Sequence, residues 1–274
     1  MSLVLITDYI PNPDIERRCL IGTCNVVTND DDFNPEDVTS VIVWHAKINS
    51  SFLNKYPNVK FIQRYGVGFD NIDLDLCKRM GIVFCNNPDY GVDEVSDTAL
   101  AKILYLTRGL GKYKQISKEL LQKRIIWQER VAPEIKRLNQ QNLLIIGAGR
   151  IGTAVILKSR NLFGTTTFFD PNVASGYEKS LQCNRSLDLL SAVRKADVIS
   201  LHCNLSESSR GIVNKEFIKN CRSNVLIINT ARGGLFESDE LILGALMEEK
   251  IGGLATDVLN NEPPTENISE MIAR

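Results

Sequence analysis

A glycine-rich turn in the second half of the chain has the residue types and spacing to hold a dinucleotide. An apolar run, Asn142 to Ile146, leads into Gly147-Ala148-Gly149-Arg150-Ile151-Gly152. Gly147 permits a tight turn, Gly149 lets a pyrophosphate approach the backbone, and Gly152 allows the next helix to pack closely on the strand. The N–H groups that begin this helix, including those of Arg150 and Ile151, would face the phosphates.

An acidic residue follows at the distance that this chemistry requires. A second strand candidate, residues 165–170, ends at Asp170, close to the roughly 20 residues past the last glycine expected for a ribose-binding carboxylate. Such a carboxylate accepts hydrogen bonds from the ribose hydroxyls and repels a 2′-phosphate. Pro171 and Asn172 follow it rather than an arginine, so the sequence favours NAD over NADP. The alternative, an ordinary glycine-rich turn, does not account for the strand, helix, second strand and acid together.

A second glycine pair, Gly66 and Gly68 around Val67, also follows a strand candidate. Asn71 stands where a third glycine would be, so a dinucleotide site is a weak interpretation here. The backbone N–H groups of Gly66, Val67 and Gly68 could bind a carboxylate. By itself, however, the loop is better interpreted as an ordinary left-handed turn.

These residues need strands and helices to position them, and the sequence alternates between the two. Strands separated by helices predict an α/β protein with parallel sheets covered on both faces. The strand candidates are residues 3–7, 40–44, 59–64, 82–85, 143–147, 165–170, 197–202, 225–230 and 253–257.

Several helix boundaries can also be predicted. Asn12 followed by Pro13 is typical of a helix start, and Asp73 can cap a helix that stops at Gly81. The longest helical stretch runs from about residue 92 to 122 and is interrupted around Gly109 and Gly111. We place a domain boundary near residue 100, with this helix as the connector and a polar region between it and the next strand.

The composition excludes several other classes of function. The 274 residues carry 32 basic and 33 acidic side chains, a net charge of −1, which gives no reason to expect nucleic acid or a membrane as partner. With two histidines and no paired-cysteine motif, we expect no metal site. The seven cysteines are odd in number and there is no signal peptide, so we expect reduced thiols and a cytoplasmic protein.

The chain resembles the D-isomer-specific 2-hydroxyacid dehydrogenases, in particular those similar to phosphoglycerate dehydrogenase. The resemblance implies two Rossmann-like, doubly wound parallel-sheet domains with a cleft between them: a flavodoxin-like substrate domain, residues 1–100, and an NAD-binding Rossmann domain, residues 101–274. It rests on the stretches RYGVGFDNIDLDLCKRMGIVFCN (64–86), NPDYGVDEVSDTAL (87–100), IIGAGRIG (145–152), ADVISLHCNLSESSRGIVN (196–214), VLIINTARGGLFESDELILGAL (225–246) and GGLATDVLNNEPP (252–264).

The resemblance also implies roles for individual residues. Arg232 would bind the substrate carboxylate and carbonyl, which suits a planar guanidinium, and the loop from Gly66 to Gly68 would meet the same carboxylate. Further cofactor contacts are implied at Thr98, Cys203, Thr230, Ala231 and Asp257.

Glu262 matches the family's catalytic glutamate, whose usual role is to hold and charge a histidine that protonates the substrate. That histidine would come later in the chain, but the sequence contains none after His202. His202 resembles the family's non-catalytic histidine beside the cofactor, and we expect it to be structural. His45, at the end of a strand, is expected to be a surface or packing residue. If these 274 residues are the whole protein, we expect little or no turnover.

The sequence therefore predicts an NAD-dependent oxidoreductase that transfers a hydride between nicotinamide and C2 of a small D-2-hydroxy or 2-oxo acid. The catalytic residues would be Arg232 and Glu262, and the family implies a homodimer. The alternative is an NAD-binding regulatory or scaffold protein of the same family with reduced or no catalysis.

Overall fold

The computed structural model describes residues 2–8, 10, 12–122 and 135–273. The chain divides into two compact units, Met1–Gly91 and Val92–Arg274. The division falls at the start of helix α4 (Val92–Thr107), whereas the sequence placed it near residue 100, inside that helix. Helix α4 belongs to the second unit because it packs on helix α6 (Arg150–Ser159) and on strands of that unit's sheet.

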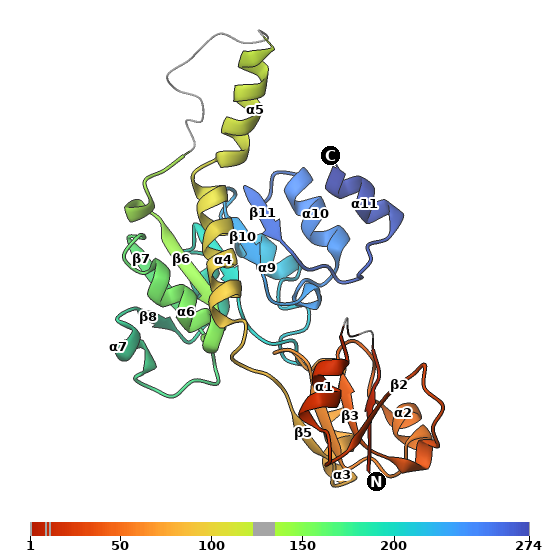
Figure 1. Cartoon of the computed structure of the whole chain (residues 1–274). Coiled ribbons are helices and arrows are strands. Elements are labelled where there is room, and N and C mark those ends of the chain that lie inside the picture. The colour runs from red at the N-terminus through yellow and green to blue at the C-terminus, as the bar shows by residue number, and fades with distance from the viewer. Residues whose placement is uncertain (1, 9, 11, 123–134, 274) are drawn as a thin grey trace. The chain divides into compact units, whose positions relative to one another are not determined.

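The first unit, red to orange in Figure 1, is a five-stranded parallel sheet in the order β2-β1-β3-β4-β5. This order is that of flavodoxin-like sheets. Its strands are β1 (Leu3–Ile6), β2 (Asn25–Thr28), β3 (Val38–Val43), β4 (Phe61–Arg64) and β5 (Val83–Cys85). Its helices are α1 (Asp14–Cys19), the short 3₁₀ helix η1 (Pro35–Asp37), α2 (Ser50–Lys55) and α3 (Leu74–Arg79).

Alternating side chains on the central strands bury both faces of this sheet. Val4 and Ile6 pack in one apolar cluster with Leu20 beside α1, and Leu5 packs in another with Leu53 of α2 and other side chains near α2 and α3. The predicted cap of α3 is confirmed, since the Asp73 carboxylate accepts a hydrogen bond of 2.8 Å from the Leu76 N–H. Gly81 follows this helix with a φ of +68°, which glycine adopts without strain.

The second unit is a six-stranded parallel sheet in the order β11-β10-β9-β6-β7-β8. This is the Rossmann order. Strands β7 and β8 are added on one side of β6, and β9, β10 and β11 are added on its other side, so the strand order reverses between β6 and β9. Its strands are β6 (Asn142–Ile146), β7 (Thr165–Phe169), β8 (Asn184–Ser186), β9 (Val198–Leu201), β10 (Leu226–Asn229) and β11 (Gly253–Thr256). The predicted α/β class with two parallel sheets is thus confirmed.

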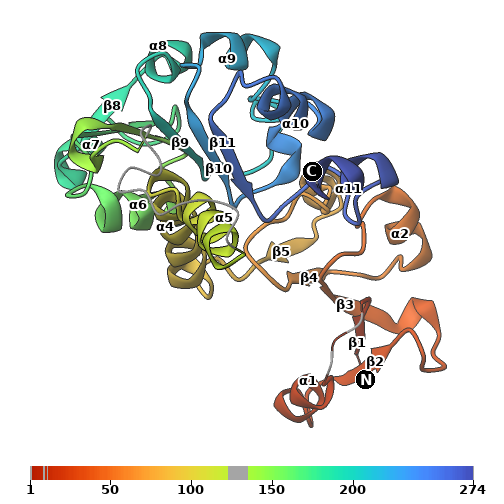
Figure 2. The ribbon, with the colours of Figure 1, turned by 90° about the horizontal axis from the view of Figure 1, so that it is seen from above.

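Helices cover both faces of the second sheet (Figure 2). Helices α4 and α6 pack on one face around Ile103, Val155 and Ile228, and helices on the opposite face pack around Phe217 and Ile227. The remaining helices are α5 (Leu110–Leu121), η2 (Leu138–Gln140), α7 (Tyr177–Leu181), α8 (Leu189–Val193), α9 (Lys215–Asn220), η3 (Gly233–Leu235), α10 (Asp239–Met247) and α11 (Glu266–Ala273).

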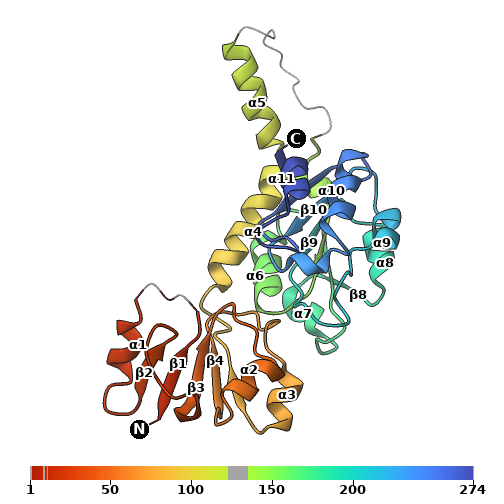
Figure 3. The same ribbon diagram turned by 90° about the vertical axis from the view of Figure 1, so that its right-hand side faces the viewer.

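The long helix is interrupted as predicted. Gly109, with a φ of +61°, separates α4 from α5, and α5 extends away from the sheet of its own unit (Figures 1 and 3). Most of the polar region expected after α5 lies outside the described residues. No helix among the residues that the structure describes is long and apolar enough to cross a membrane.

Two strands and one helix boundary differ from the predictions. Strands β2 and β8 were not predicted, and both are edge strands with polar residues, so neither shows the apolar run of a central strand. Helix α1 begins at Asp14, one residue later than the pairing of Asn12 with Pro13 indicates, and Pro13 occupies the cap position. The Asn12 side chain accepts a hydrogen bond of 3.2 Å from the Asp14 N–H.

Candidate cofactor and substrate site

Most of the predicted cofactor contacts, together with Arg232, lie at one edge of the second sheet. All six strands are parallel, so the residues that follow them meet at the carboxyl edge of the sheet, where open α/β sheets bind ligands. These residues are Gly147–Gly152 after β6, Asp170 after β7, Cys203 after β9, Thr230–Arg232 after β10 and Asp257 after β11.

The three glycines of the turn have three different surroundings. A Cβ on Gly147 would lie 2.4 Å from the Cys203 nitrogen, at the point where the sheet reverses direction, and Gly147 also has a φ of +93°. A Cβ on Gly152 would lie 1.9 Å from the Gly147 carbonyl oxygen. A Cβ on Gly149 would meet nothing within 4 Å. Gly147 and Gly152 are therefore required by packing, whereas Gly149 leaves open space in front of the backbone.

Helix α6 begins beside that open space. Gly149 is its N-cap residue and supplies no side-chain hydrogen bond, and the helix continues for ten residues from Arg150. The first N–H groups of a helix have no partner within the helix, and its dipole favours a negative charge at this end. Ile151 is half-buried and packs against the cluster beneath α4 and α6. The turn therefore offers backbone N–H groups to a phosphate.

The Asp170 carboxylate is fixed by two backbone hydrogen bonds. One oxygen accepts from the Ala148 N–H at 2.8 Å, and the other accepts from the Asn172 N–H at 2.8 Å. Because each carboxylate oxygen has two lone pairs, both oxygens can still accept from a hydroxyl. This suits a pair of ribose hydroxyls.

The turn that carries Arg232 is held by a buried amide. Asn229, at the end of β10, accepts a hydrogen bond of 3.0 Å from the Ala231 N–H and donates one of 2.9 Å to the Arg232 carbonyl. Sequence reasoning did not select Asn229, although an asparagine at a strand end is typical of such turns. The half-buried Arg232 guanidinium donates a hydrogen bond of 2.8 Å to the Ala231 carbonyl.

Thr230, in the same turn, has a polar atom that lacks a partner. Its Oγ1 is buried and forms no hydrogen bond in the structure, although buried hydroxyls are rarely left in this state. A polar group of a bound molecule would satisfy it. The unpartnered hydroxyl, the open space at Gly149 and the fixed Asp170 carboxylate together fit a dinucleotide.

Glu262 lies in a turn that packs directly against the Arg232 loop. A Cβ on Gly233 would lie 1.9 Å from the Leu259 carbonyl, so these two segments touch through their backbones. The buried Asp239 carboxylate accepts from the Asn260 N–H at 3.0 Å, which fixes the same turn. Glu262 itself is exposed, and its Oε1 accepts a hydrogen bond of 2.9 Å from the Leu259 N–H.

The other predicted cofactor contacts lie around this edge. Asp257 is exposed and faces Lys102 of α4, with 3.9 Å between the charged atoms. Thr98 is one helical turn before Lys102 and shares its face of α4. Burial raises the pKa of Cys203 to about 11, so its thiol stays uncharged beside Gly147.

The two histidines are placed at strand ends as expected. His202 follows β9, and its Nε2 lies 2.8 Å from the Ser200 Oγ. Burial lowers the pKa of His202 to about 4, so its ring is neutral at physiological pH. A neutral imidazole bonded to a serine suits a structural role. His45 follows β3 in the first unit and stacks on Trp44, with ring centroids 4.7 Å apart.

The second glycine loop lies at the carboxyl end of β4 in the first unit. Gly66 has a φ of +125°, and its missing Cβ leaves room for the Arg64 guanidinium. The Asn87 N–H donates to the Gly66 carbonyl at 3.1 Å, and the Asn86 amide donates to the Val67 carbonyl at 2.7 Å. The carbonyl groups of this loop are thus fixed, with a guanidinium packed beside them.

Within the described ranges, no three histidine, cysteine, aspartate or glutamate side chains gather as a metal site.

Comparison with known proteins agrees with this geometry. Residues 100–272 match the family model "D-isomer specific 2-hydroxyacid dehydrogenase, NAD binding domain". The chain is 33% identical over 226 residues to C-terminal-binding protein 1 of Caenorhabditis elegans, a match that covers 81% of this chain and 31% of that protein. It is 31% identical over 273 residues to D-3-phosphoglycerate dehydrogenase of Bacillus subtilis (strain 168), covering 97% of this chain and 50% of that enzyme.

The chain thus spans half or less of the length of these two curated relatives. Among solved structures, D-lactate dehydrogenase of Aquifex aeolicus, complexed with NAD and lactic acid, superposes with a TM-score of 0.84. That match has 24% sequence identity and covers 98% of this chain and 84% of the enzyme, and it shows a common fold.

Proposed function

Because the chain belongs to the D-isomer-specific 2-hydroxyacid dehydrogenase family and carries its NAD-binding domain, we propose that it is an NAD-dependent oxidoreductase. Its substrate would be a small D-2-hydroxy acid or the corresponding 2-oxo acid. The observation that carries the proposal is the position of Arg232, at the same sheet edge as the glycine turn and Asp170. A cation for the acid and a site for the cofactor therefore share one edge.

Arg232 would bind and polarise the substrate. A guanidinium presents parallel N–H groups, so it can hold the carboxylate and draw electron density from the neighbouring carbonyl oxygen. The Asn229 amide keeps the Arg232 backbone in place while this happens. NAD, when bound, would supply hydride exchange with C2 of the acid, while the hydroxyl proton would pass to or from the acid–base pair that includes Glu262.

Three further groups have proposed roles in this reaction. The loop from Gly66 to Gly68 would bind the substrate carboxylate through its N–H groups. Asp170 would bind the ribose, and Glu262 would hold a proton-transferring histidine in its charged form. His202 does not suit that role, because its pKa of about 4 keeps it neutral and Ser200 is its hydrogen-bond partner.

The second candidate is an NAD-binding regulatory or scaffold protein. The observation that favours it is the 33% identity with a relative named for binding rather than for catalysis. Both candidates require the cofactor site, so NADH binding alone does not separate them. They differ in whether a 2-oxo acid is reduced.

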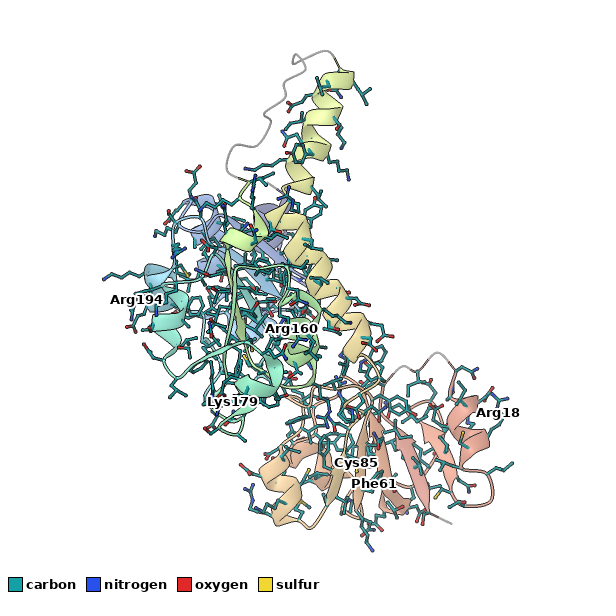
Figure 4. The ribbon with its side chains drawn as sticks, turned by 90° about the vertical axis from the view of Figure 1, so that its left-hand side faces the viewer. Arg18, Phe61, Cys85, Arg160, Lys179 and Arg194 are labelled. Carbon is teal, nitrogen blue, oxygen red and sulfur yellow. The ribbon has the colours of Figure 1, made fainter. Side chains whose placement is uncertain are left out.

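NADH oxidation by the full chain, measured with a panel of 2-oxo acids, tests the proposal. Because the sequence has no histidine after His202 to pair with Glu262, we expect at most slow turnover with at least one acid, and we expect Arg232→Ala to lower it at least about a hundredfold, as loss of a polarising group does. NADH affinity should be unchanged in that variant. The matched control is Arg194→Ala, an exposed arginine (labelled in Figure 4) that bonds Asn220 at 2.6 Å. NADH binding without oxidation by any acid would favour the scaffold.

We further propose that the protein is a cytoplasmic homodimer. Helix α5 has no buried residue and exposes Leu110, Tyr113 and Leu121, the last with 85% of its surface accessible. A contiguous exposed apolar patch often marks a protein–protein interface. The seven cysteines all lie in the described residues and carry free thiols, which suits a reducing compartment. Light scattering should give twice the monomer mass, and Leu121→Glu should halve it; a monomeric wild type would contradict the dimer.

A further inference from the structure

Arg185 lies on edge strand β8, next to strand β7, which Asp170 follows. We propose that Arg185 sets the preference for NAD over NADP by holding the loop of residues 170–174 in place. This inference rests on the proposed role of Asp170 in binding the ribose. Arg185 would act through that loop, as a positioning residue.

The Arg185 side chain bonds three carbonyl groups of the loop. Its Nη2 donates to the carbonyls of Asp170 and Val173, each at 3.0 Å, and its Nη1 donates to the carbonyl of Ala174 at 3.1 Å. Its guanidinium carbon also lies 5.9 Å from the centre of the Phe168 ring, on β7. One half-buried side chain therefore joins the end of β7 to both ends of the loop.

This arrangement fixes Asp170 from its backbone side. The Asp170 carboxylate is held by the N–H groups of Ala148 and Asn172, while its carbonyl is held by Arg185. Asn172 is itself part of the loop that Arg185 holds. Loss of Arg185 would free three carbonyl groups and loosen the hydrogen bond from Asn172. The carboxylate would then no longer be confined to the position where it meets a ribose hydroxyl and repels a 2′-phosphate.

The three hydrogen bonds of Arg185 also decide where its charge points. They turn the guanidinium toward the loop backbone rather than toward a 2′-phosphate. Two hydrogens of Nη2 serve two carbonyl groups, and Nη1 serves a third. Arginines that recognise phosphate do so by turning this planar pair of nitrogens toward the oxygens. Here that pair is turned toward the protein backbone, so the cation stabilises the loop.

The test compares the affinities of NADH and NADPH by calorimetry with the full chain. We expect the wild type to prefer NADH. In Arg185→Gln, NADH should bind about tenfold more weakly, the loss expected when one charged hydrogen bond no longer positions a ligand. NADPH affinity should be unchanged or higher, because the repelling carboxylate is no longer fixed. The ratio of the two affinities should therefore fall by about tenfold or more.

The matched control is Arg160→Gln. Arg160, also half-buried and labelled in Figure 4, donates to the Leu181 carbonyl at 3.0 Å and holds no residue of the loop after β7. This variant should keep the wild-type ratio. If the glutamine variant does not fold, Arg185→Lys can be used to measure the same affinity ratio. Lysine keeps the charge but cannot hold three carbonyls at once. Its ratio should fall by about threefold, which is half of the tenfold effect on a free-energy scale.

Three results would overturn the inference. Equal weakening of NADH and NADPH would mean that Arg185 only supports the fold, and unchanged affinities would mean that it does not position Asp170. Selective loss of NADPH would mean that Arg185 itself contacts the 2′-phosphate. Failure of the proposed NAD site itself looks different, since the wild type would then bind neither nucleotide.

Discussion

The carboxylate of Asp170 accepts a hydrogen bond of 2.8 Å from the backbone N–H of Ala148. Ala148 lies between the first two glycines of the turn after β6, and Asp170 directly follows the neighbouring strand β7. The two parts of the dinucleotide motif, separated along the chain, are therefore bonded directly. The same bond fixes the carboxylate at the glycine turn, so the local fold prepares the site before a ligand arrives.

Gly149 and Gly152 should respond differently to alanine. Gly149→Ala meets no atom within 4 Å and has an ordinary φ of −72°, so its melting temperature should stay within about 2 °C of wild type. NADH affinity should nevertheless fall at least about tenfold, because the methyl group occupies the place of the pyrophosphate. Gly152→Ala would place a carbon 1.9 Å from a backbone carbonyl and should destabilise the fold itself.

Thermal melts and NADH titrations of both variants check this pair. If Gly149→Ala binds NADH as tightly as wild type, the pyrophosphate does not lie at this turn. If Gly152→Ala melts at the wild-type temperature, α6 does not pack closely against the Gly147 carbonyl.

His202 should make the protein less stable in mild acid. Its folded pKa of about 4 lies below its ordinary value of 6.5, so the unfolded chain takes up a proton first as the pH falls. The contribution of the neutral ring is complete above pH 6.5 and is lost progressively down to about pH 4. Between pH 7 and pH 5 this amounts to up to about 2 kcal/mol.

Urea unfolding of the wild type and of His202→Gln, at both pH values, measures this contribution. The loss of stability between pH 7 and pH 5 should be smaller in the variant. Equal losses in the two proteins would show that His202 does not stay neutral in the folded state.

Asp239 should be important for stability although it contacts no substrate. Only 3% of its surface is exposed, and both carboxylate oxygens accept from the Asn260 N–H. Asp239→Ala removes the charged acceptor of that N–H, which costs about 1–3 kcal/mol. Glu240→Ala, at the next position on the exposed side of α10, is the matched control and should be neutral. Equal free energies of unfolding for the two variants would refute this role.

The sequence predicted those parts of the site that are coded locally. The glycine turn depends on a few adjacent residues, as does the Asp73 cap elsewhere in the fold, and the spacing from Gly152 to the end of the next strand is enough to select Asp170. Arg185 and Asp239 could not be predicted in the same way, because their partners lie 11 to 21 residues away and meet them only in the folded chain. Strands β2 and β8 were missed for a related reason, since an edge strand depends on its neighbour more than on its own apolar residues.

Calorimetric titration of NADH into the wild type and Asp170→Ala tests the central claim, that the glycine turn and Asp170 form one NAD site. Glu216→Ala, which removes an exposed carboxylate from α9, is the control. The wild type and the control should bind NADH alike. Asp170→Ala should bind it about 10- to 100-fold more weakly, because hydrogen bonds between the ribose and a charged acceptor are lost. Equal affinity in Asp170→Ala and wild type would contradict the account.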